Sequence, residues 1–284
     1  MLSATQIESY QTNGYLVVDN VLSEAQVAEL NALIDHAVER SIHVESNDDM
    51  YDLEPGHSKA RPRVRGIRDP LALAPPFEEV SRSEAVLDIV ESVVGPNIRH
   101  ELSFINIKPA GGGSPVQWHQ DFGILPYTND DLVVCGLALT DSSIRNGCLQ
   151  VIPGSHRGPI LDHHQDGVMI GAVQEHTPGF DLDHAVPVEV PAGGMSLHHF
   201  RILHGSAPNH SDSDRRVYFL DYAAADSFPI AKKIAPAEFD QRIVRGTSTR
   251  QARMIPLNFP IPNRERRANV LFHLQAGLRE PVYS

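Results

Sequence analysis

Two side chains that bind transition metals stand two residues apart in the segment Gln117-Trp118-His119-Gln120-Asp121. In a strand, residues i and i+2 point to the same side, so His119 and Asp121 can present an imidazole and a carboxylate to one point in a cavity. These groups are two of the three protein ligands of a 2-His-1-carboxylate site, which leaves positions open on Fe(II). A His-x-Asp pair alone is weak evidence, because short pairs of this kind often arise by chance.

A third candidate ligand follows far along the chain. Residues 195–199 read as a strand after a Gly-Gly turn, His204 lies shortly beyond it, and Arg215 and Arg216 stand at the start of another strand. If the strands close into a barrel, His204 can complete the metal site. An arginine further on can then bind the distal carboxylate of a dicarboxylate co-substrate through two parallel hydrogen bonds. These elements in this order are much harder to obtain by chance than the pair.

Other histidines compete with this assignment. His198 and His199 occupy adjacent positions of the strand at 195–199, so they face opposite sides and one of them can point into the cavity. Either could replace the third ligand. His163 and His164 could form a second metal site or contact the substrate, but a polar loop satisfied by water is the favoured interpretation.

Three runs of sequence closely resemble one enzyme family: WHQDFG, NGCLQVIPGSHRG and HHFRILHGSAPNHSDSDRR. The family is the phytanoyl-CoA dioxygenase (PhyH) family of Fe(II)- and 2-oxoglutarate-dependent oxygenases. The likeness is densest over residues 99–225, and residues 3–40 also resemble the usual start of the family. The resemblance implies a mainly β fold with flanking α-helices. Its core is a double-stranded β-helix, jelly-roll and cupin-like, with the N-terminal helices packed outside.

The resemblance also implies the main residues of the site. It assigns Fe(II) to His119, Asp121 and His204, which are then the catalytic residues. It places the basic residue that binds the far carboxylate of 2-oxoglutarate at Arg215, with Arg216 as the alternative.

Two further residues are implied for the co-substrate. Ser206 is the hydroxyl expected beside the arginine, and Gln117 is expected to contact the end of 2-oxoglutarate that chelates iron. The chemistry of the family uses O2 and 2-oxoglutarate to oxidise an unactivated C–H bond, with release of succinate and CO2. Because Asp121 is present where related halogenases have a small residue, hydroxylation is favoured over halogenation. Desaturation and ring chemistry stay open.

The predicted substrate is a small polar molecule. Residues 122–131 directly follow the metal pair and are expected to cross the pocket mouth, although a plain connecting loop is an equal interpretation. A weaker resemblance at 127–131 and 162–167 points to family members that oxidise aminoalkyl-phosphonates. The candidate substrate contacts are Tyr127, Thr128, Asn129 and His198.

Hydrophobic periodicity predicts the elements that carry these residues. Helices are expected at 3–13, 23–40 and 83–94. The pattern dissolves over 41–70, which is predicted to be a long loop and a flexible lid. One domain is predicted over residues 1–284. Short strands are expected at 15–18, 100–108, 133–140, 148–152, 186–190, 195–199 and 217–223.

Composition and charge narrow the class of partner. A formal net charge of −12 argues against nucleic acid or an anionic membrane surface and leaves a small-molecule substrate. Cys135 and Cys148 are expected to be reduced and buried. The N-terminal run MLSATQIESYQTNGY lacks the basic and apolar regions of a signal peptide, and no apolar run approaches about 18 residues, so a cytoplasmic location is predicted. The oligomeric state is left open.

Two alternative functions share the same residues. A barrel of this fold can bind a ligand or partner without turnover, but such proteins lose a metal ligand and none is missing here. A Zn(II) hydrolase can also use three protein ligands and a water molecule. That enzyme would have no use for Arg215.

Overall fold

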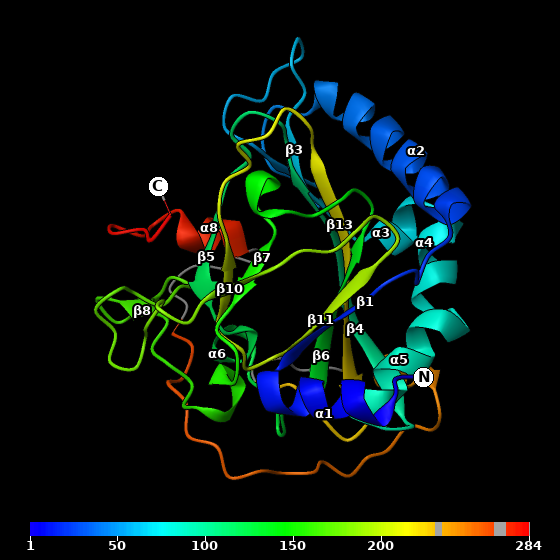
Figure 1. The fold of residues 1–284 in the computed structure, drawn as a ribbon, viewed down its shortest axis with the longest axis vertical. Coiled ribbons are helices and arrows are strands. Elements are labelled where there is room, and N and C mark those ends of the chain that lie inside the picture. Colours follow the sequence, from blue (N-terminus) through cyan, green and yellow to red (C-terminus); the bar gives the residue numbers. More distant parts are fainter. Residues whose placement is uncertain (231–234, 264–270, 284) are drawn as a thin grey trace.

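Two antiparallel β-sheets form the centre of the computed structural model, which describes residues 1–230, 235–263 and 271–283 (Figure 1). The larger sheet runs in the order β1 (Tyr15–Val18), β11 (Met195–His199), β6 (Leu132–Ala138), β13 (Arg215–Ala224), β4 (Ile98–Lys108), β3 (Val64–Arg68) and β2 (Tyr51–Leu53), and β14 (Ile243–Arg245) also pairs with β4. The smaller sheet runs β10 (Val186–Val188), β7 (Leu149–Val151), β12 (His204–Ser206) and β5 (Val116–His119), and β8 (His164–Gln165) forms a hairpin with β9 (Val168–Met169). The sheets stay separate rather than closing into a barrel, and the predicted jelly-roll core with outer helices is confirmed.

Helices pack along one side of the larger sheet (Figure 1). Ser23 begins the long helix α2 with a capping box, in which its side chain and that of Gln26 each bond the other's backbone N–H. The helices predicted at 3–13, 23–40 and 83–94 are confirmed to within one residue. The helices are α1 (Ala4–Asn13), α2 (Glu24–Arg40), α3 (Pro70–Leu73), α4 (Pro75–Ser81), α5 (Glu84–Val94), α6 (Asp121–Ile124), α7 (Pro236–Gln241) and α8 (Leu271–Gln275), with 3-10 turns at Ser41–His43, Ile144–Asn146 and Ser155–Arg157.

Strand β13 has two chemically different faces. The Tyr218 hydroxyl donates to the backbone oxygen of Phe77 at 3.0 Å, and the Tyr222 hydroxyl donates to that of Ser81 at 2.6 Å. These bonds satisfy two buried phenols and fix the sheet to α4. Because side chains alternate along a strand, the other face of β13 lines the space between the sheets. That face presents Arg215, Phe219 and Asp221.

The segment 41–70 is not the structureless loop that the sequence predicts. Strands β2 and β3 extend the larger sheet beyond β4, and Ile67 is fully buried. The charged residues of this segment suggested a loop, but two of them pair across the strands. Arg68 forms an ion pair with the buried Asp52 at 2.6 Å. The prediction is wrong for these strands, since cross-strand pairing of distant charges is invisible to a local pattern. Movement of the segment as a lid stays a prediction.

The two cysteines lie in the interior of the protein. Cys135 and Cys148 are both buried and unpaired, as predicted. Among the helices of the described ranges, none combines the length and apolar character that a membrane crossing needs.

The turn before β7 generates a prediction about stability. Gly147 has φ +75, and an added Cβ would overlap the backbone oxygen of Ala207. Gly147→Ala is expected to lower the free energy of unfolding by about 3 kcal/mol, because left-handed strain and overpacking add. Gly167→Ala is the matched control, since Gly167 has φ +76 and open space around a Cβ, and it should cost about 1 kcal/mol. Urea unfolding measures both, and equal losses would contradict the packing argument.

Candidate metal centre

Three side chains converge at one point between the sheets. His119 ends β5 and His204 begins β12, and the two residues are direct partners across these antiparallel strands. Nε2 of His119 lies 3.4 Å from Oδ1 of Asp121, and Nε2 of His204 lies 3.8 Å from Oδ2 of Asp121. The three ligand atoms lie within 4.8 Å of one another. Two imidazoles and one carboxylate are the donor set of a facial Fe(II) site.

The His119-x-Asp121 pair is only half in a strand, which corrects the prediction that both residues share one. Strand β5 ends at His119, and Asp121 opens α6. Gln120 between them keeps extended backbone angles, φ −120 and ψ 126. The two side chains therefore still project to the same side, although the strand has stopped.

Backbone carbonyls orient both imidazole rings. Nδ1 of His119 lies 2.8 Å from the oxygen of Gln117, and Nδ1 of His204 lies 3.0 Å from the oxygen of Ile202. Because a carbonyl can only accept, each Nδ1 carries the proton and each Nε2 offers its lone pair to the centre. Burial, together with nearby His119, holds the pKa of His204 well below 6.5 and favours the neutral ring that a metal requires.

The carboxylate of Asp121 lacks a protein partner for one oxygen. Oδ2 is buried and, among the described residues, no hydrogen bond reaches it. With both imidazoles neutral, the three side chains together offer one carboxylate charge and two nitrogen lone pairs to the space between them. A buried, ionised oxygen without a donor fits a bound cation, so the residues present suit the metal that the sequence predicts.

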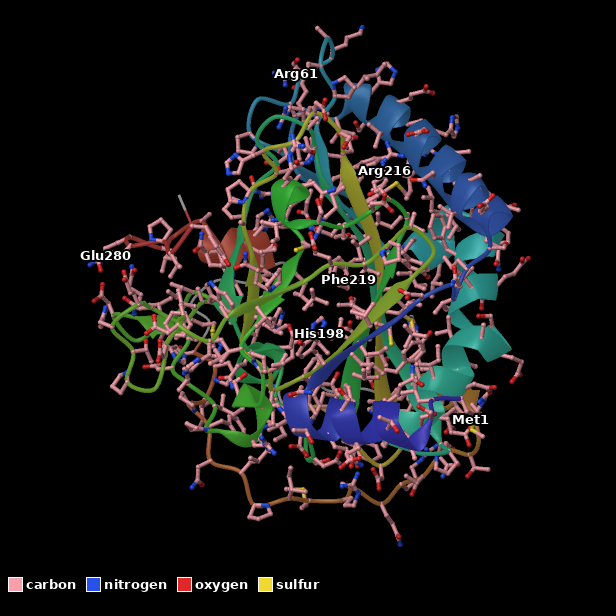
Figure 2. The ribbon with its side chains drawn as sticks, in the orientation of Figure 1. Met1, Arg61, His198, Arg216, Phe219 and Glu280 are labelled. Carbon is pink, nitrogen blue, oxygen red and sulfur yellow. The ribbon has the colours of Figure 1, made fainter. Side chains whose placement is uncertain are left out.

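His198 faces the centre from the opposite sheet. Its Nε2 lies 3.6 Å from Oδ2 of Asp121, and its ring centroid lies 4.6 Å from that of His204. Figure 2 shows His198 and Phe219 directed toward the interior between the sheets. His199 points the other way and packs on His156, with ring centroids 5.0 Å apart. The alternation predicted for this pair is present, and the metal cluster is completed by His204 rather than by either neighbour.

His163 supports the backbone between two ligands. Its Nε2 accepts a hydrogen bond from the Gln120 N–H at 2.8 Å, and its Nδ1 lies 2.9 Å from the oxygen of Leu161. The neighbouring His164 instead contacts Asp162 at 2.6 Å. The two histidines therefore separate, and His163 holds Gln120 in place rather than contributing to a second metal site.

Arg215 and Arg216 have different surroundings. Arg216 points toward α2 and pairs with Asp35 at 2.7 Å (Figure 2). Arg215 is 3% exposed, donates to the oxygen of Gly147 at 2.9 Å and to the side chain of Asn106, and has no carboxylate partner among the described residues. Burial lowers its pKa only to about 10, so the guanidinium stays charged. A buried guanidinium without an anionic partner can bind an anionic group of a ligand. These contacts favour Arg215 over Arg216 as the residue that binds the co-substrate carboxylate.

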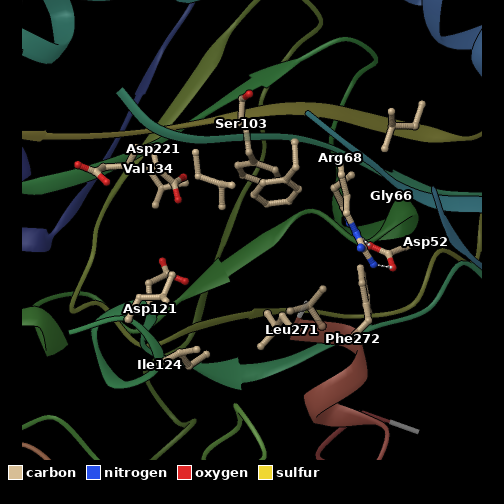
Figure 3. Close-up of a pocket in the computed structure, with 18 of the residues that line it drawn as sticks. Asp52, Gly66, Arg68, Ser103, Asp121, Ile124, Val134, Asp221, Leu271 and Phe272 are labelled. Atoms are coloured by element: carbon tan, nitrogen blue, oxygen red, sulfur yellow. Dashed lines mark hydrogen bonds and ion pairs between the residues drawn. The ribbon is translucent and has the colours of Figure 1, made fainter. Parts of the chain in front are cut away.

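One cavity of about 670 Å³ joins these groups (Figure 3). His198, Ser206 and Arg215 line it together with the three metal ligands. Arg68 and Asp52 lie toward its other end, beside Leu271 and Phe272 of α8. The prediction that the metal ligands, the arginine and the serine share one space therefore agrees with the geometry.

Gln117 does not face this cavity. Its amide donates to the backbone oxygen of Tyr283 at 2.8 Å and accepts from the Tyr283 N–H at 3.0 Å. The C-terminal segment thus uses both polar atoms of the side chain. The predicted contact of Gln117 with 2-oxoglutarate is not supported, because the competing partner lies at the far end of the chain.

The predicted substrate contacts after the metal pair also lie outside the cavity lining. The Tyr127 hydroxyl donates to Glu101 at 3.1 Å, and the Thr128 hydroxyl accepts from the Phe228 N–H at 3.0 Å. Asn129 is fully buried and donates to the backbone of residues 226 and 253. These three side chains fasten the loop to the rest of the fold, so the plain connecting interpretation holds for them.

Several cavity residues escape the sequence analysis. Asp221 could have been found from strand alternation, since it lies on the same face of β13 as Arg215. Lys108, the cross-strand partner of Arg215, does not line the cavity, but its buried ammonium donates to the backbone oxygen of Ser206 at 3.0 Å behind it. No local signal marks Leu271 and Phe272, because α8 reaches the cavity only through the tertiary fold.

The environment of His163 generates a prediction about pH. Burial lowers its pKa to about 4, so the folded chain keeps this ring neutral while the unfolded chain takes up a proton near pH 6.5. The free energy of unfolding of the metal-free protein should therefore fall between pH 6.5 and pH 4. His163→Gln keeps an acceptor for Gln120 and should flatten this slope by up to about 1.4 kcal/mol per pH unit.

Urea unfolding at several pH values measures this slope. His176→Gln is the control, because His176 is exposed and its replacement should leave the slope unchanged. An identical slope for the parent and His163→Gln would mean that His163 is protonated in the folded protein.

Known proteins resemble this chain in sequence and in fold. A family model described as phytanoyl-CoA dioxygenase (PhyH) matches residues 10–217. The chain is 34% identical to the probable alpha-ketoglutarate-dependent hypophosphite dioxygenase of Stutzerimonas stutzeri, over 91% of this chain and 92% of that protein. It is 27% identical to peroxisomal phytanoyl-CoA dioxygenase of Rattus norvegicus, over 82% of this chain and 72% of that protein.

Solved structures agree in fold. EctD from S. alaskensis with bound Fe matches with a TM-score of 0.68 at 22% identity, over 90% of this chain and 89% of that chain. The family model covers His119, Asp121, His204 and Arg215 in one continuous match. The chain therefore belongs to the phytanoyl-CoA dioxygenase (PhyH) family of 2-oxoglutarate-dependent dioxygenases.

Proposed function

We propose that this dioxygenase hydroxylates an unactivated C–H bond of a small polar molecule. The observation that carries the proposal is one cavity lined by three convergent metal ligands and by a buried arginine without a carboxylate partner. The ligands suit a cation, and Arg215 suits the far carboxylate of 2-oxoglutarate. A Zn(II) hydrolase would leave this arginine without a role.

In this proposal, the residues of the chain bind the metal and the co-substrate and orient them. His119, Asp121 and His204 would hold Fe(II), which together with 2-oxoglutarate and O2 would supply the oxidising power, with succinate and CO2 as co-products. Arg215 fixes the far end of the co-substrate from the larger sheet, and Ser206 contributes a hydroxyl to the cavity from the smaller sheet. The apolar wall that includes Phe219 and Val134 limits water around the reacting C–H bond.

The charged side chains in the cavity lining, Arg215 and Asp221 among them, support a polar substrate. A relative 34% identical is named a probable hypophosphite dioxygenase, which supports a compact phosphorus-containing anion as one group of the substrate. An aminoalkyl-phosphonate remains our candidate for the class. A single domain over residues 1–284 and a cytoplasmic location stay predictions.

The metal site generates the first prediction about the proposed function. Addition of Fe(II) and 2-oxoglutarate without O2 should produce a weak visible absorption band, because the co-substrate chelates the ion. His204→Ala removes one of three ligands and should abolish the band and lower substrate-stimulated succinate release at least about 100-fold. Turnover with Zn(II) alone, after chelation of iron, would revive the hydrolase alternative.

The two adjacent arginines give a matched pair for the second prediction. Arg215→Lys replaces a two-pronged contact with a single one and should raise the KM for 2-oxoglutarate by about 10- to 100-fold. Arg216→Lys makes the same change on the outer face of the strand and should leave that KM within about twofold. Steady-state succinate formation measures both variants. Equal effects would remove Arg215 from the co-substrate site.

A further inference from the structure

A carboxyl group faces the metal ligands from the opposite wall of the cavity. Asp221 lies on β13, and Figure 3 shows Asp121 and Asp221 on facing walls. Across the larger sheet, His198 of β11 and Asp221 of β13 both pair with Val134 of β6, so the three residues form one transverse row. Two strand spacings separate the Cα atoms of His198 and Asp221, roughly 10 Å. Asp221 is thus within the length of one small molecule from the metal centre.

In the described part of the chain, no hydrogen bond or ion pair reaches the carboxyl of Asp221. The residue is 7% exposed, its Oδ1 is buried without a hydrogen bond, and no ion pair reaches it among the described residues. Burial, followed by the charges of Asp121 and Glu101, holds its pKa well above the usual range. A buried unpartnered carboxyl is costly, and a structural explanation would require a donor that the described residues do not supply.

The other buried acid groups of the cavity lining already have partners, and Asp69 is exposed to solvent. Glu101 is hydrogen-bonded by Arg99 and by the Tyr127 hydroxyl. Asp121 belongs to the metal cluster. Asp221 is therefore the buried acid near the metal that remains available to a bound molecule.

We propose that Asp221 binds a primary ammonium group of the substrate and so selects amine-bearing molecules. The proposal rests on the proposed function and names a substrate class for that site. A cation converts a costly buried carboxyl into an ion pair, and an ammonium group offers several N–H donors in a small volume.

The test compares two probes that differ by one ammonium group. Enzyme loaded with Fe(II) and 2-oxoglutarate without O2 is titrated with 2-aminoethylphosphonate and with ethylphosphonate, by calorimetry in two buffers of different ionisation enthalpy. The parent should bind the amine at least about tenfold more tightly and release about one proton. Asp221→Asn should weaken binding of the amine by about 10- to 100-fold, release no proton, and change ethylphosphonate by less than about threefold.

Two further variants control for folding and for charge. Asp69→Asn also removes a cavity-lining carboxyl, at φ 46 where asparagine is tolerated, and should keep the preference for the amine. Thermal unfolding checks that Asp221→Asn folds. If the asparagine destabilises the protein, Asp221→Ser is used in its place.

The proposal is overturned if the parent does not prefer the amine, or if Asp221→Asn keeps that preference. Equal weakening of both probes would instead make Asp221 a neutral donor to an oxyanion. Two measurements test the dioxygenase function without testing Asp221. They are the slow formation of succinate in the absence of substrate and the visible absorption band. If these survive while the preference for the amine is absent, the assignment of Asp221 fails and the proposed function stands.

Discussion

The pairing of β5 with β12 is the constraint on which the site depends. It sets His119 directly opposite His204, so two imidazoles separated by a large part of the chain become neighbours. The short extension through Gln120 then brings in the carboxylate of Asp121. A shift of this register by one residue would turn one ring to the other face of the sheet and dismantle the cluster.

Three of the buried polar groups that the described residues leave incompletely partnered line the same cavity. There, Asp121 has an oxygen that accepts no hydrogen bond, Arg215 has no carboxylate partner, and Asp221 has a carboxyl oxygen without a donor. Each such group costs on the order of 1–3 kcal/mol in the empty protein. On the helix-facing side of β13, the side chains of Tyr218 and Tyr222 belong to the apolar core, and both tyrosine hydroxyls are hydrogen-bonded. Stability and function are thus divided between the two faces of one strand.

Sequence patterns predict the frame of this molecule better than its contacts. The helices and the central strands follow from capping residues and periodicity, and the spacing of the histidines together with the family resemblance predicts the metal ligands. Tyr127, Thr128 and Asn129 were reasonable substrate contacts by position, but their side chains bond residues about 25 to more than 100 positions away in the sequence. Gln117 is taken by Tyr283 for the same reason. Local patterns cannot reveal such long-range partners.

The orientation of the imidazole rings by backbone carbonyls has a consequence for which ion the protein carries. Ligands already fixed by the fold cannot reject an unsuitable divalent ion by failing to assemble around it. Affinity at such a nitrogen and oxygen site rises from Fe(II) through Ni(II) to Cu(II), so iron is not the ion that binds most tightly. The occupant of this centre therefore depends on which metals are available to the protein, and not on the affinity of the three ligands alone.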